Sequence, residues 1–151
     1  MKKISIIFLS LVAFVATASA SPLAVFDKDR HIEFSQLPAD AQAFVTKNFA
    51  AERVSYVELD EGIVSNEYKV VFESGLKLEF DGSGNWTEID CRHQPVPQSL
   101  VPKQIVSYVA SKYPNHQIVE LKRDRYEWEV KLNNGLELSF DKKYNLTDID
   151  D

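Results

Sequence analysis

The sequence predicts an α+β protein. The predicted architecture is a tandem duplication of a helix-plus-antiparallel-sheet unit (α-β-β-β-β), with the helices on one face of a joined antiparallel sheet. Three observations support it: an internal repeat, a helical apolar stripe at the start of each copy, and period-two alternation in the rest of each copy. The repeat is clearest where GLKLEFDGSGNWTEID (75–90) aligns with GLELSFDKKYNLTDID (135–150), with nine of sixteen positions identical.

The first twenty residues have the pattern of a secretory signal peptide. MKK is a basic start, ISIIFLSLVAFVATA is an apolar run, and Ala18-Ser19-Ala20 is a small-residue cleavage site. The apolar run is shorter than the roughly 20 residues that a membrane span needs. We therefore predict a signal peptide over 1–20, no membrane span after its cleavage, and a periplasmic or secreted protein.

The charge balance limits the possible partners, and the cysteine count limits the possible disulfide bonds. Without Lys2 and Lys3, 15 of the 17 basic side chains remain against 23 acidic ones, a net charge of −8. Such a chain repels phosphate backbones, so nucleic acid is not an expected partner. Cys91 is the only cysteine, so no intramolecular disulfide is possible and the fold must depend on burial of apolar side chains.

The two copies set the predicted domain boundaries. An N-terminal segment (21–34) precedes unit 1 (35–90), a linker with two prolines (91–98) follows, and unit 2 covers 99–151. The alignment offset falls from 64 to 60 at one point, as expected for a length change in a surface turn. A unit of about 55 residues buries little core, so two units joined edge to edge would supply the missing burial and hide an edge.

Each unit is predicted to begin with a helix. The apolar residues of the first helix recur at i, i+3, i+4 and i+8, and those of the second repeat the spacing: Ala41, Phe44, Val45, Phe49, then Ile105, Tyr108, Val109, Tyr113. Pro38 and Pro102 fit the first helical position, where a missing N–H costs little. Pro114 ends the second helix.

The rest of each unit alternates as strands do. The predicted inward positions are Tyr68, Val70, Phe72, Leu76, Leu78 and Phe80 in unit 1, and Trp128, Val130, Leu132, Leu136, Leu138 and Phe140 in unit 2. Asn134-Gly135 predicts a hairpin in which both turn residues have positive φ. Each unit also has a preceding and a closing strand: Ser55–Asp60 and Trp86–Ile89, then Val119–Arg123 and Leu146–Ile149. An edge strand is expected within Asp27–Phe34.

These stretches resemble the PepSY-like family of exported bacterial proteins, also labelled β-lactamase-inhibitor-like. The resemblance rests on LPADAQAFVTKNF, on EYKVVFESGLKLEFDGSGNWTEID and on their second copies, and it covers nearly the whole mature chain. It implies tandem units similar to those of the β-lactamase inhibitor protein and SmpA. The related PepSY domains are thought to restrain secreted peptidases. The family pattern brings no catalytic residues with it.

No set of side chains predicts catalysis or a cofactor. The histidines at 31, 93 and 116 stand apart in the sequence, and no nucleophile elbow accompanies them. Cys91-x-His93 offers only two metal ligands, so a partly buried thiol is favoured over a metal site or an intermolecular disulfide. We therefore expect no enzyme, no catalytic residue, no metal site and no cofactor.

Carboxylates are numerous, but their pattern favours a solvated sheet face over a site. Between Asp81 and Asn85, oxygen-bearing side chains stand at alternate positions, as they do at the start of a calcium-binding loop. The later ligands of such a loop are missing, so a hairpin turn is favoured. Alternation places Glu79 and Glu137 on the outer face, where no pair with a raised pKa is expected.

The outer sheet face is the candidate partner-binding surface. Aromatic residues among charged ones are typical of interfaces, although ordinary sheet surface is the alternative. The candidate residues are Tyr56, Lys69, Val71, Lys77, Glu79 and Trp86. We predict a non-catalytic exported module that engages or inhibits an exported protein, with a peptidase or cell-wall enzyme as candidate partners. The alternative function is an envelope calcium or small-ligand binding protein.

Overall fold

The structure is a computed structural model that describes residues 29–151. Two α-helices, α1 (Ala39–Asn48) and α2 (Lys103–Lys112), are each preceded by a short 3-10 turn, Phe34–Gln36 and Gln98–Leu100. The strands are β1 (Asp29–Ile32), β2 (Val54–Glu61), β3 (Asn66–Phe72), β4 (Lys77–Asp81), β5 (Trp86–Asp90), β6 (Ile118–Arg123), β7 (Glu127–Leu132), β8 (Glu137–Asp141) and β9 (Leu146–Asp150). The predicted signal peptide lies outside the described residues.

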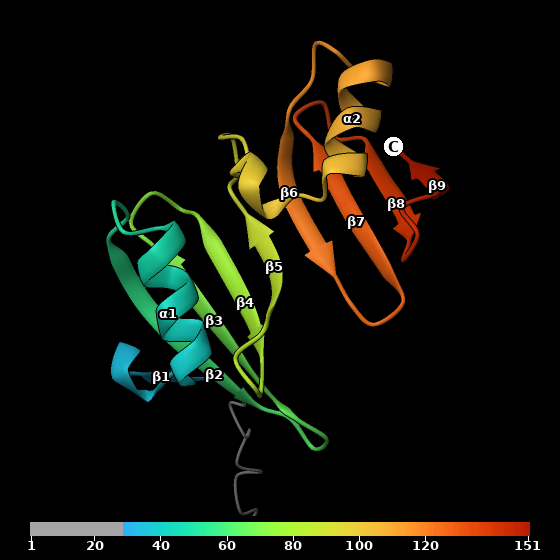
Figure 1. The fold of residues 1–151 in the computed structure, drawn as a ribbon. Coiled ribbons are helices and arrows are strands. Elements are labelled where there is room, and N and C mark those ends of the chain that lie inside the picture. The colour runs from blue at the N-terminus through green and yellow to red at the C-terminus, as the bar shows by residue number, and fades with distance from the viewer. Residues whose placement is uncertain (1–28) are drawn as a thin grey trace, which may run out of the picture.

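All nine strands form one antiparallel sheet whose spatial order follows the chain, from β1 to β9 (Figure 1). We call α1 with β2–β5 the first half and α2 with β6–β9 the second half. The halves meet where β5 pairs with β6, in only three residue pairs: Glu88 with Lys122, Ile89 with Leu121, and Asp90 with Glu120. The predicted edge strand is present as β1, which pairs with β2.

The core lies against one face of this sheet, because alternate residues of each strand point the same way. One apolar row crosses all nine strands in register: Ile32, Val57, Val70, Leu78, Ile89, Leu121, Val130, Leu138 and Ile149. Leu78 and Leu138 are fully buried, as predicted, and so are Phe80 and Phe140 in the neighbouring row. Period two therefore identified the inward positions of these strands.

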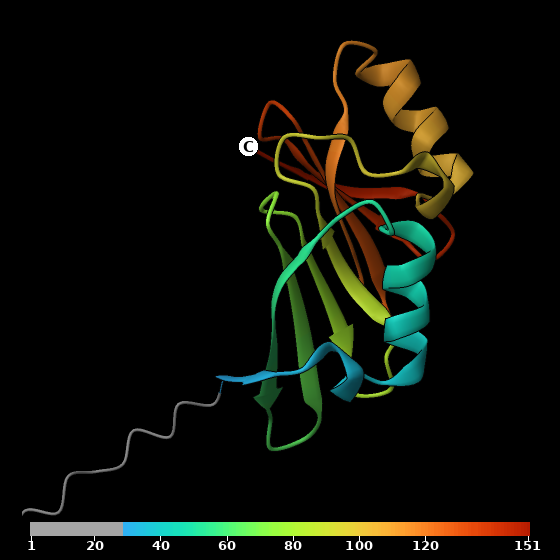
Figure 2. The same ribbon diagram turned by 90° about the vertical axis from the view of Figure 1, so that its left-hand side faces the viewer.

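Each helix packs against the strands of its own half (Figure 2). Ala41 and Val45 of α1 are buried, and the Phe44 ring lies 5.8 Å from the Phe80 ring, centre to centre. In α2 the Tyr108 ring meets Phe140 edge-on at 5.4 Å. The expectation for the two prolines is wrong by one position: Pro38 and Pro102 have extended backbone and are the N-caps.

The hairpin predicted at Asn134-Gly135 is present between β7 and β8, but its backbone differs from the expectation. Only Gly135 has positive φ, at 95°, whereas Asn134 does not. The loop has three residues, 133–135, because the Leu132 amide donates to the Leu136 carbonyl oxygen at 2.8 Å and the Gly135 amide to the Leu132 carbonyl oxygen at 2.9 Å. Such a loop is a type I turn followed by one left-handed residue.

The predicted fold class, an α+β tandem of helix-plus-sheet units with helices on one face, is wrong. One nine-stranded antiparallel sheet dominates the structure, and it runs without a break across the predicted unit boundary. The α-helices have ten residues each, so each is about 15 Å long. Nine strands at about 4.8 Å spacing span about 38 Å. Two such helices do not form a layer that matches the sheet.

The predicted boundaries at 35–90, 91–98 and 99–151 stay predictions. Neither α-helix of residues 29–151 has the length and apolar character that crossing a bilayer requires.

Candidate binding groove and outer sheet face

A row of mostly charged residues crosses the outer face of the sheet, opposite the core. In register from β1 to β9 it reads His31, Glu58, Lys69, Glu79, Glu88, Lys122, Glu129, Ser139 and Asp148. We call this set the charged row. It follows from the same alternation that builds the core, because each of these residues adjoins an inward one in sequence.

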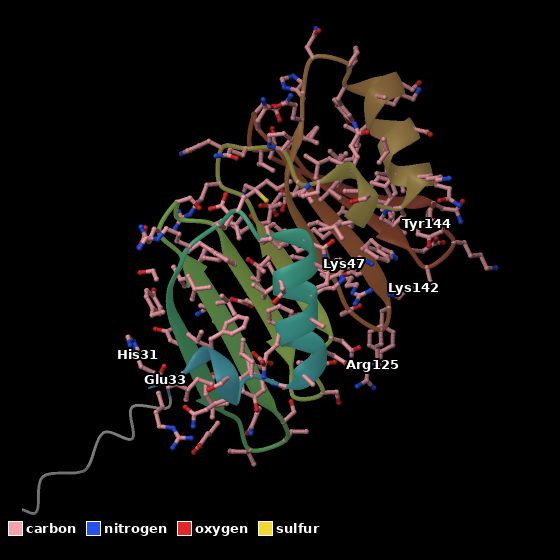
Figure 3. The ribbon with its side chains drawn as sticks, turned by 60° about the vertical axis from the view of Figure 1, so that its left-hand side comes forward. His31, Glu33, Lys47, Arg125, Lys142 and Tyr144 are labelled. Carbon is pink, nitrogen blue, oxygen red and sulfur yellow. The ribbon has the colours of Figure 1, made fainter. Side chains whose placement is uncertain are left out.

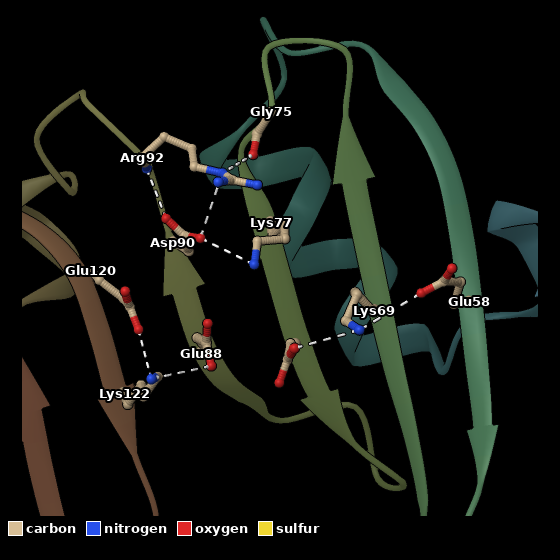
Figure 4. A network of polar contacts seen from close by, with 10 residues as sticks. Glu58, Lys69, Gly75, Lys77, Glu88, Asp90, Arg92, Glu120 and Lys122 are labelled. Carbon is tan, nitrogen blue, oxygen red and sulfur yellow. Dashed lines mark hydrogen bonds and ion pairs between the residues drawn. The ribbon is translucent and has the colours of Figure 1, made fainter. Parts of the chain in front are cut away.

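Lysines join the carboxylates of the charged row into ion pairs (Figure 4). Lys69 Nζ lies 3.7 Å from Glu58 and 3.9 Å from Glu79. Lys122 Nζ contacts three carboxylates, those of Glu120 at 2.7 Å, Glu129 at 3.7 Å and Glu88 at 3.8 Å. The two halves have opposite polarity, since their first strands carry Glu58 and Lys122 at corresponding positions.

Glu79 and Glu88 are direct cross-strand neighbours of like charge. Burial raises the pKa of Glu88, and the charge of Glu79 raises it further, while Lys122 opposes the shift. Burial alone would lower the pKa of Lys122, but the hydrogen bond to Glu120 and the surrounding carboxylates raise it above its usual value. The junction of the two halves therefore carries a glutamate and a lysine whose pKa values are both raised.

Five of the six predicted binding residues lie on the outer face. Tyr56, Val71 and Lys77 are cross-strand neighbours in one row, while Lys69 and Glu79 belong to the charged row. The Tyr56 ring is 38% exposed, and it stacks on His31 with the ring centres 5.1 Å apart. Their role in binding a partner stays a prediction.

The placement of the sixth residue, Trp86, on the outer face is wrong. Trp86 is 8% exposed, and its ring stacks on Phe44 of α1 at 6.1 Å. The cause is a β-bulge: Glu79 pairs with Glu88, but Phe80 pairs with Trp86, which leaves Thr87 as an extra residue in β5. One extra residue reverses the side to which the following residue points.

A groove of about 740 Å³ lies where β5 and β6 part beyond their three paired residues. Residues from five strands and three turns line it: Glu67, Glu79, Asp81, Asn85, Trp86, Thr87, Glu88, Lys122, Arg123, Asp124, Arg125, Glu127, Trp128, Glu129 and Lys142. Seven of these carry a carboxylate and four carry a cation, so their net charge is 4 − 7 = −3. Glu79 and Trp86 are the two predicted binding residues that the groove brings together.

Aromatic rings and cations form the floor of the groove. The guanidinium carbon of Arg123 lies 3.8 Å from the Trp86 ring centre and 5.8 Å from that of Trp128, and the two rings are 5.9 Å apart. Lys142 Nζ lies 5.4 Å from the centre of Trp128, and Tyr144 packs on the same ring. Burial lowers the pKa of Arg123, while the charge of Asp81 opposes this. Such a floor favours planar side chains of a partner, which can stack on rings and on a guanidinium.

Arg125, Lys142 and Tyr144 reach this region from two turns of the second half (Figure 3). The sequence reasoning missed them together with Arg123 and Trp128, because turns and strands far apart in the chain bring them together. The available signal was Arg123-Asp-Arg-Tyr-Glu-Trp128, where two cations and two aromatic residues fall within six positions.

The carboxylate of Asp81 stabilises the turn from Asp81 to Asn85 by accepting hydrogen bonds within it. Asp81 Oδ1 accepts hydrogen bonds from the backbone amides of Ser83 and Asn85, both at 2.9 Å. Burial would raise the pKa of Asp81, but the bonds from Asn85 and the turn amides hold it below its usual value. Asp141 closes its turn in the same way. These carboxylates shape hairpins.

A smaller cavity of about 140 Å³ lies further along the outer face, lined by Glu58, Asp60, Glu67, Tyr68, Lys69 and Glu79. Asp60 Oδ1 is buried there without a hydrogen-bond partner. Asp60 is also directly opposite Glu67, which in turn is opposite Asp81. In residues 29–151, no three His, Cys, Asp or Glu side chains are grouped closely enough to hold a metal ion by themselves.

Cys91 directly follows β5 and is buried, with 6% of its surface exposed. Burial raises the pKa of its thiol to about 11, with smaller contributions from the charges of Asp90 and Glu52. The partly buried thiol that the sequence favoured is more completely enclosed than expected. His93, its proposed co-ligand, is exposed.

Comparisons with known proteins give one family and several solved structures. The family described as "Putative beta-lactamase-inhibitor-like, PepSY-like" matches residues 66–148. A "putative periplasmic protein from DUF2874 family" of Bacteroides vulgatus is 40% identical, with a TM-score of 0.80 over 83% of this chain and 99% of that one. No curated protein matches the chain.

Two further solved structures are similar. A "putative calcium-regulated periplasmic protein" of Bacteroides thetaiotaomicron is 40% identical, with a TM-score of 0.80 over 83% of this chain and 98% of that one. A "putative periplasmic protein of unknown function" of Bacteroides vulgatus is 31% identical, with a TM-score of 0.78 over 82% of this chain and 99% of that one.

Proposed function

Since this chain belongs to the PepSY-like family and is a periplasmic protein, we propose that it is a non-catalytic binding module for another exported protein. The proposed contact surface is the groove between β5 and β6 together with the outer sheet face beside it. The family's β-lactamase-inhibitor-like description supports a protein as the partner.

The observation that carries this proposal is the cluster that Arg123 forms with Trp86, over whose ring it lies, and with the neighbouring Trp128 in an acidic groove. Tryptophan and arginine are among the side chains that most often anchor protein interfaces. The surplus of carboxylates favours a partner that inserts basic side chains, because like charges would repel an acidic one. The partner surface is therefore expected to be basic, with planar side chains at its centre.

Capture from a periplasmic extract by the immobilised protein tests this proposal. Glu67→Lys and Glu127→Lys reverse the charge of two exposed groove residues without touching the core. Both should lose the captured partner. Glu73→Lys is the matched control, because Glu73 is exposed outside the groove in a surface ion pair with Arg53. Thermal unfolding of each variant checks that the fold is intact.

Retention of the partner by both groove variants would reject the groove as the contact. Tyr56→Ala in the same experiment tests the patch predicted from the sequence, because Tyr56 lies on the outer face away from the groove. A loss with Tyr56→Ala but not with the groove variants would place the contact on that patch.

Calcium or small-ligand binding is the second candidate function. The unpartnered Asp60 Oδ1 in its acidic cavity favours it, and one similar structure carries the description "calcium-regulated". Calcium bound at this cavity would raise the melting temperature by mass action. The rise should be absent in Asp60→Asn and weaker with magnesium. A melting temperature that stays constant through millimolar calcium would remove this candidate.

A further inference from the structure

The strand β9 is an edge of the sheet that pairs on one side only. Within residues 29–151 it pairs with β8 and with no other strand. Its other side presents backbone N–H and C=O groups, which are the template for adding a strand. Ile149, in the middle of β9, is 48% exposed, although it belongs to the apolar row that is otherwise covered.

In the first half, β5 is the counterpart of β9, and its outer edge is paired with another strand. On β4, Leu78 pairs with Ile89 of β5; on β8, Leu138 pairs with Ile149 of β9. The registers of the two pairs match throughout, including a bulge at the same position. β5 then receives β6, which places Leu121 opposite Ile89 and leaves Ile89 fully buried. The molecule thus shows which kind of strand fits the edge of β9.

The charges on β9 indicate which kind of strand would pair with its free edge. In the template, Lys122 stands opposite Glu88. The corresponding residue of β9 is Asp148, which is exposed and, like Asp150, forms no ion pair with any described residue. A second copy pairing through its own β9 would bring these carboxylates together, and like charges in opposite positions are destabilising. A basic strand removes this repulsion.

We propose that β9 binds an extended segment of another protein by antiparallel strand addition. The segment places an apolar side chain opposite Ile149 and basic side chains opposite Asp148 and Asp150. Backbone hydrogen bonds supply affinity in this mode, and alternate side chains supply specificity. This interface lies at the sheet edge outside the groove, so it stands or falls independently of the function proposed above.

The probe is a capped, fluorescent peptide, IVKLKR, which has the sequence of β6 with the E120K substitution. The peptide is titrated with the full-length protein. The matched peptide is the unchanged sequence IVELKR, which sets a glutamate opposite Asp150. Backbone amide shifts locate the bound peptide, and fluorescence anisotropy gives the two affinities. We expect the shifts on β9, and about fivefold tighter binding of the lysine peptide, because one repulsive pair becomes attractive.

Asp148→Lys in the protein should weaken binding of the lysine peptide by about fivefold. Glu61→Lys, an exposed reversal near the opposite edge, and the groove variant Glu127→Lys should leave it unchanged. Equal affinities for the two peptides, shifts outside β9, or no effect of Asp148→Lys would overturn the proposal. So would a β9-dependent dimer in sedimentation, which would make a second copy the occupant.

Discussion

Arg123 stacks on Trp86 and also donates a hydrogen bond to it. The guanidinium carbon lies 3.8 Å from the ring centre, and Nε–H donates to the Trp86 carbonyl oxygen at 2.9 Å. Arg123 belongs to β6 and Trp86 to β5, so these two contacts link the halves just beyond the last paired residues of the two strands. The groove floor therefore contributes to stability as well as to the proposed binding.

Arg123→Lys should lower the free energy of unfolding by about 1–3 kcal/mol. Lysine keeps the charge, but it has no planar group to stack on the Trp86 ring while also donating a hydrogen bond to the Trp86 carbonyl oxygen. Urea unfolding monitored by circular dichroism measures the change. Arg125→Lys is the control, because Arg125 is exposed and lies 5.7 Å from the Tyr126 ring, and it should shift the midpoint little. Equal effects of the two substitutions would contradict the assigned role of Arg123.

Ile89→Ala and Ile149→Ala should lower the free energy of unfolding by very different amounts. The two isoleucines occupy corresponding positions, since Ile89 pairs with Leu78 and Ile149 pairs with Leu138. Ile89 is fully buried, so its truncation should cost about 2–5 kcal/mol of unfolding free energy. Ile149 is 48% exposed and should cost clearly less. Guanidinium denaturation of the two variants gives the comparison. Similar losses would show that Ile149 is covered in solution.

Glu88→Gln should stabilise the protein at neutral pH. Burial and Glu79 raise the folded-state pKa of Glu88 above its ordinary value of 4.5, so the charged form is disfavoured by folding. In the intact protein this cost is absent below about pH 4.5 and grows as the pH rises through the folded-state pKa. The gain from Glu88→Gln should therefore be present at pH 7 and vanish below about pH 4.5 in a series of melting curves.

Glu137→Gln provides a control of opposite sign. The hydrogen bond from Lys131 lowers the folded-state pKa of Glu137, so its charge favours folding above the unfolded-state value. Its removal should destabilise the protein slightly at neutral pH, by the small amount typical of an exposed pair, and the loss should disappear in acid. Stability changes of the same sign in the two variants would contradict the opposite pKa shifts of Glu88 and Glu137.

Gly84→Ala should cost more than Gly135→Ala. Both glycines have positive φ, 89° and 95°, which costs a residue with a side chain about 1–2 kcal/mol. A Cβ at Gly84 would also lie 2.8 Å from Pro38 Cβ and 3.1 Å from the Ala41 amide nitrogen, whereas nothing lies within 4 Å at Gly135. α1 would have to shift away from the turn. Thermal unfolding of both variants measures the difference, and equal losses would mean that α1 adjusts freely.

Local patterns in the sequence identified the parts of the fold that depend on near neighbours. Alternation found the inward side chains of β3, β4, β7 and β8, because a strand repeats every two residues. It misplaced Trp86, because the extra residue Thr87 changes the parity and no composition signal marks it. The fold class was wrong for a different reason. Periodicity shows which side of each helix and strand is buried, but not that a single nine-stranded sheet would dominate two helices of ten residues each.

The groove was hidden from the sequence because its residues come from segments that are distant in the chain. Trp86 and Arg123 are 37 positions apart, and their contact depends on the bulge in β5 and on the short pairing of β5 with β6. Alternation did identify Lys69 and Glu79 as outward-facing, and the structure joins them in an ion pair. Outward position alone, however, did not distinguish a groove from ordinary sheet surface.

The opposite polarity of the two halves has a consequence for chain assembly. Glu88 at the end of the first half meets Lys122, whereas the corresponding residue of the first half itself is Glu58. A concatemer of first halves would thus set glutamate against glutamate at every seam. Charge at this junction therefore favours a second half, with Lys122, over another first half, with Glu58, as the neighbour of β5.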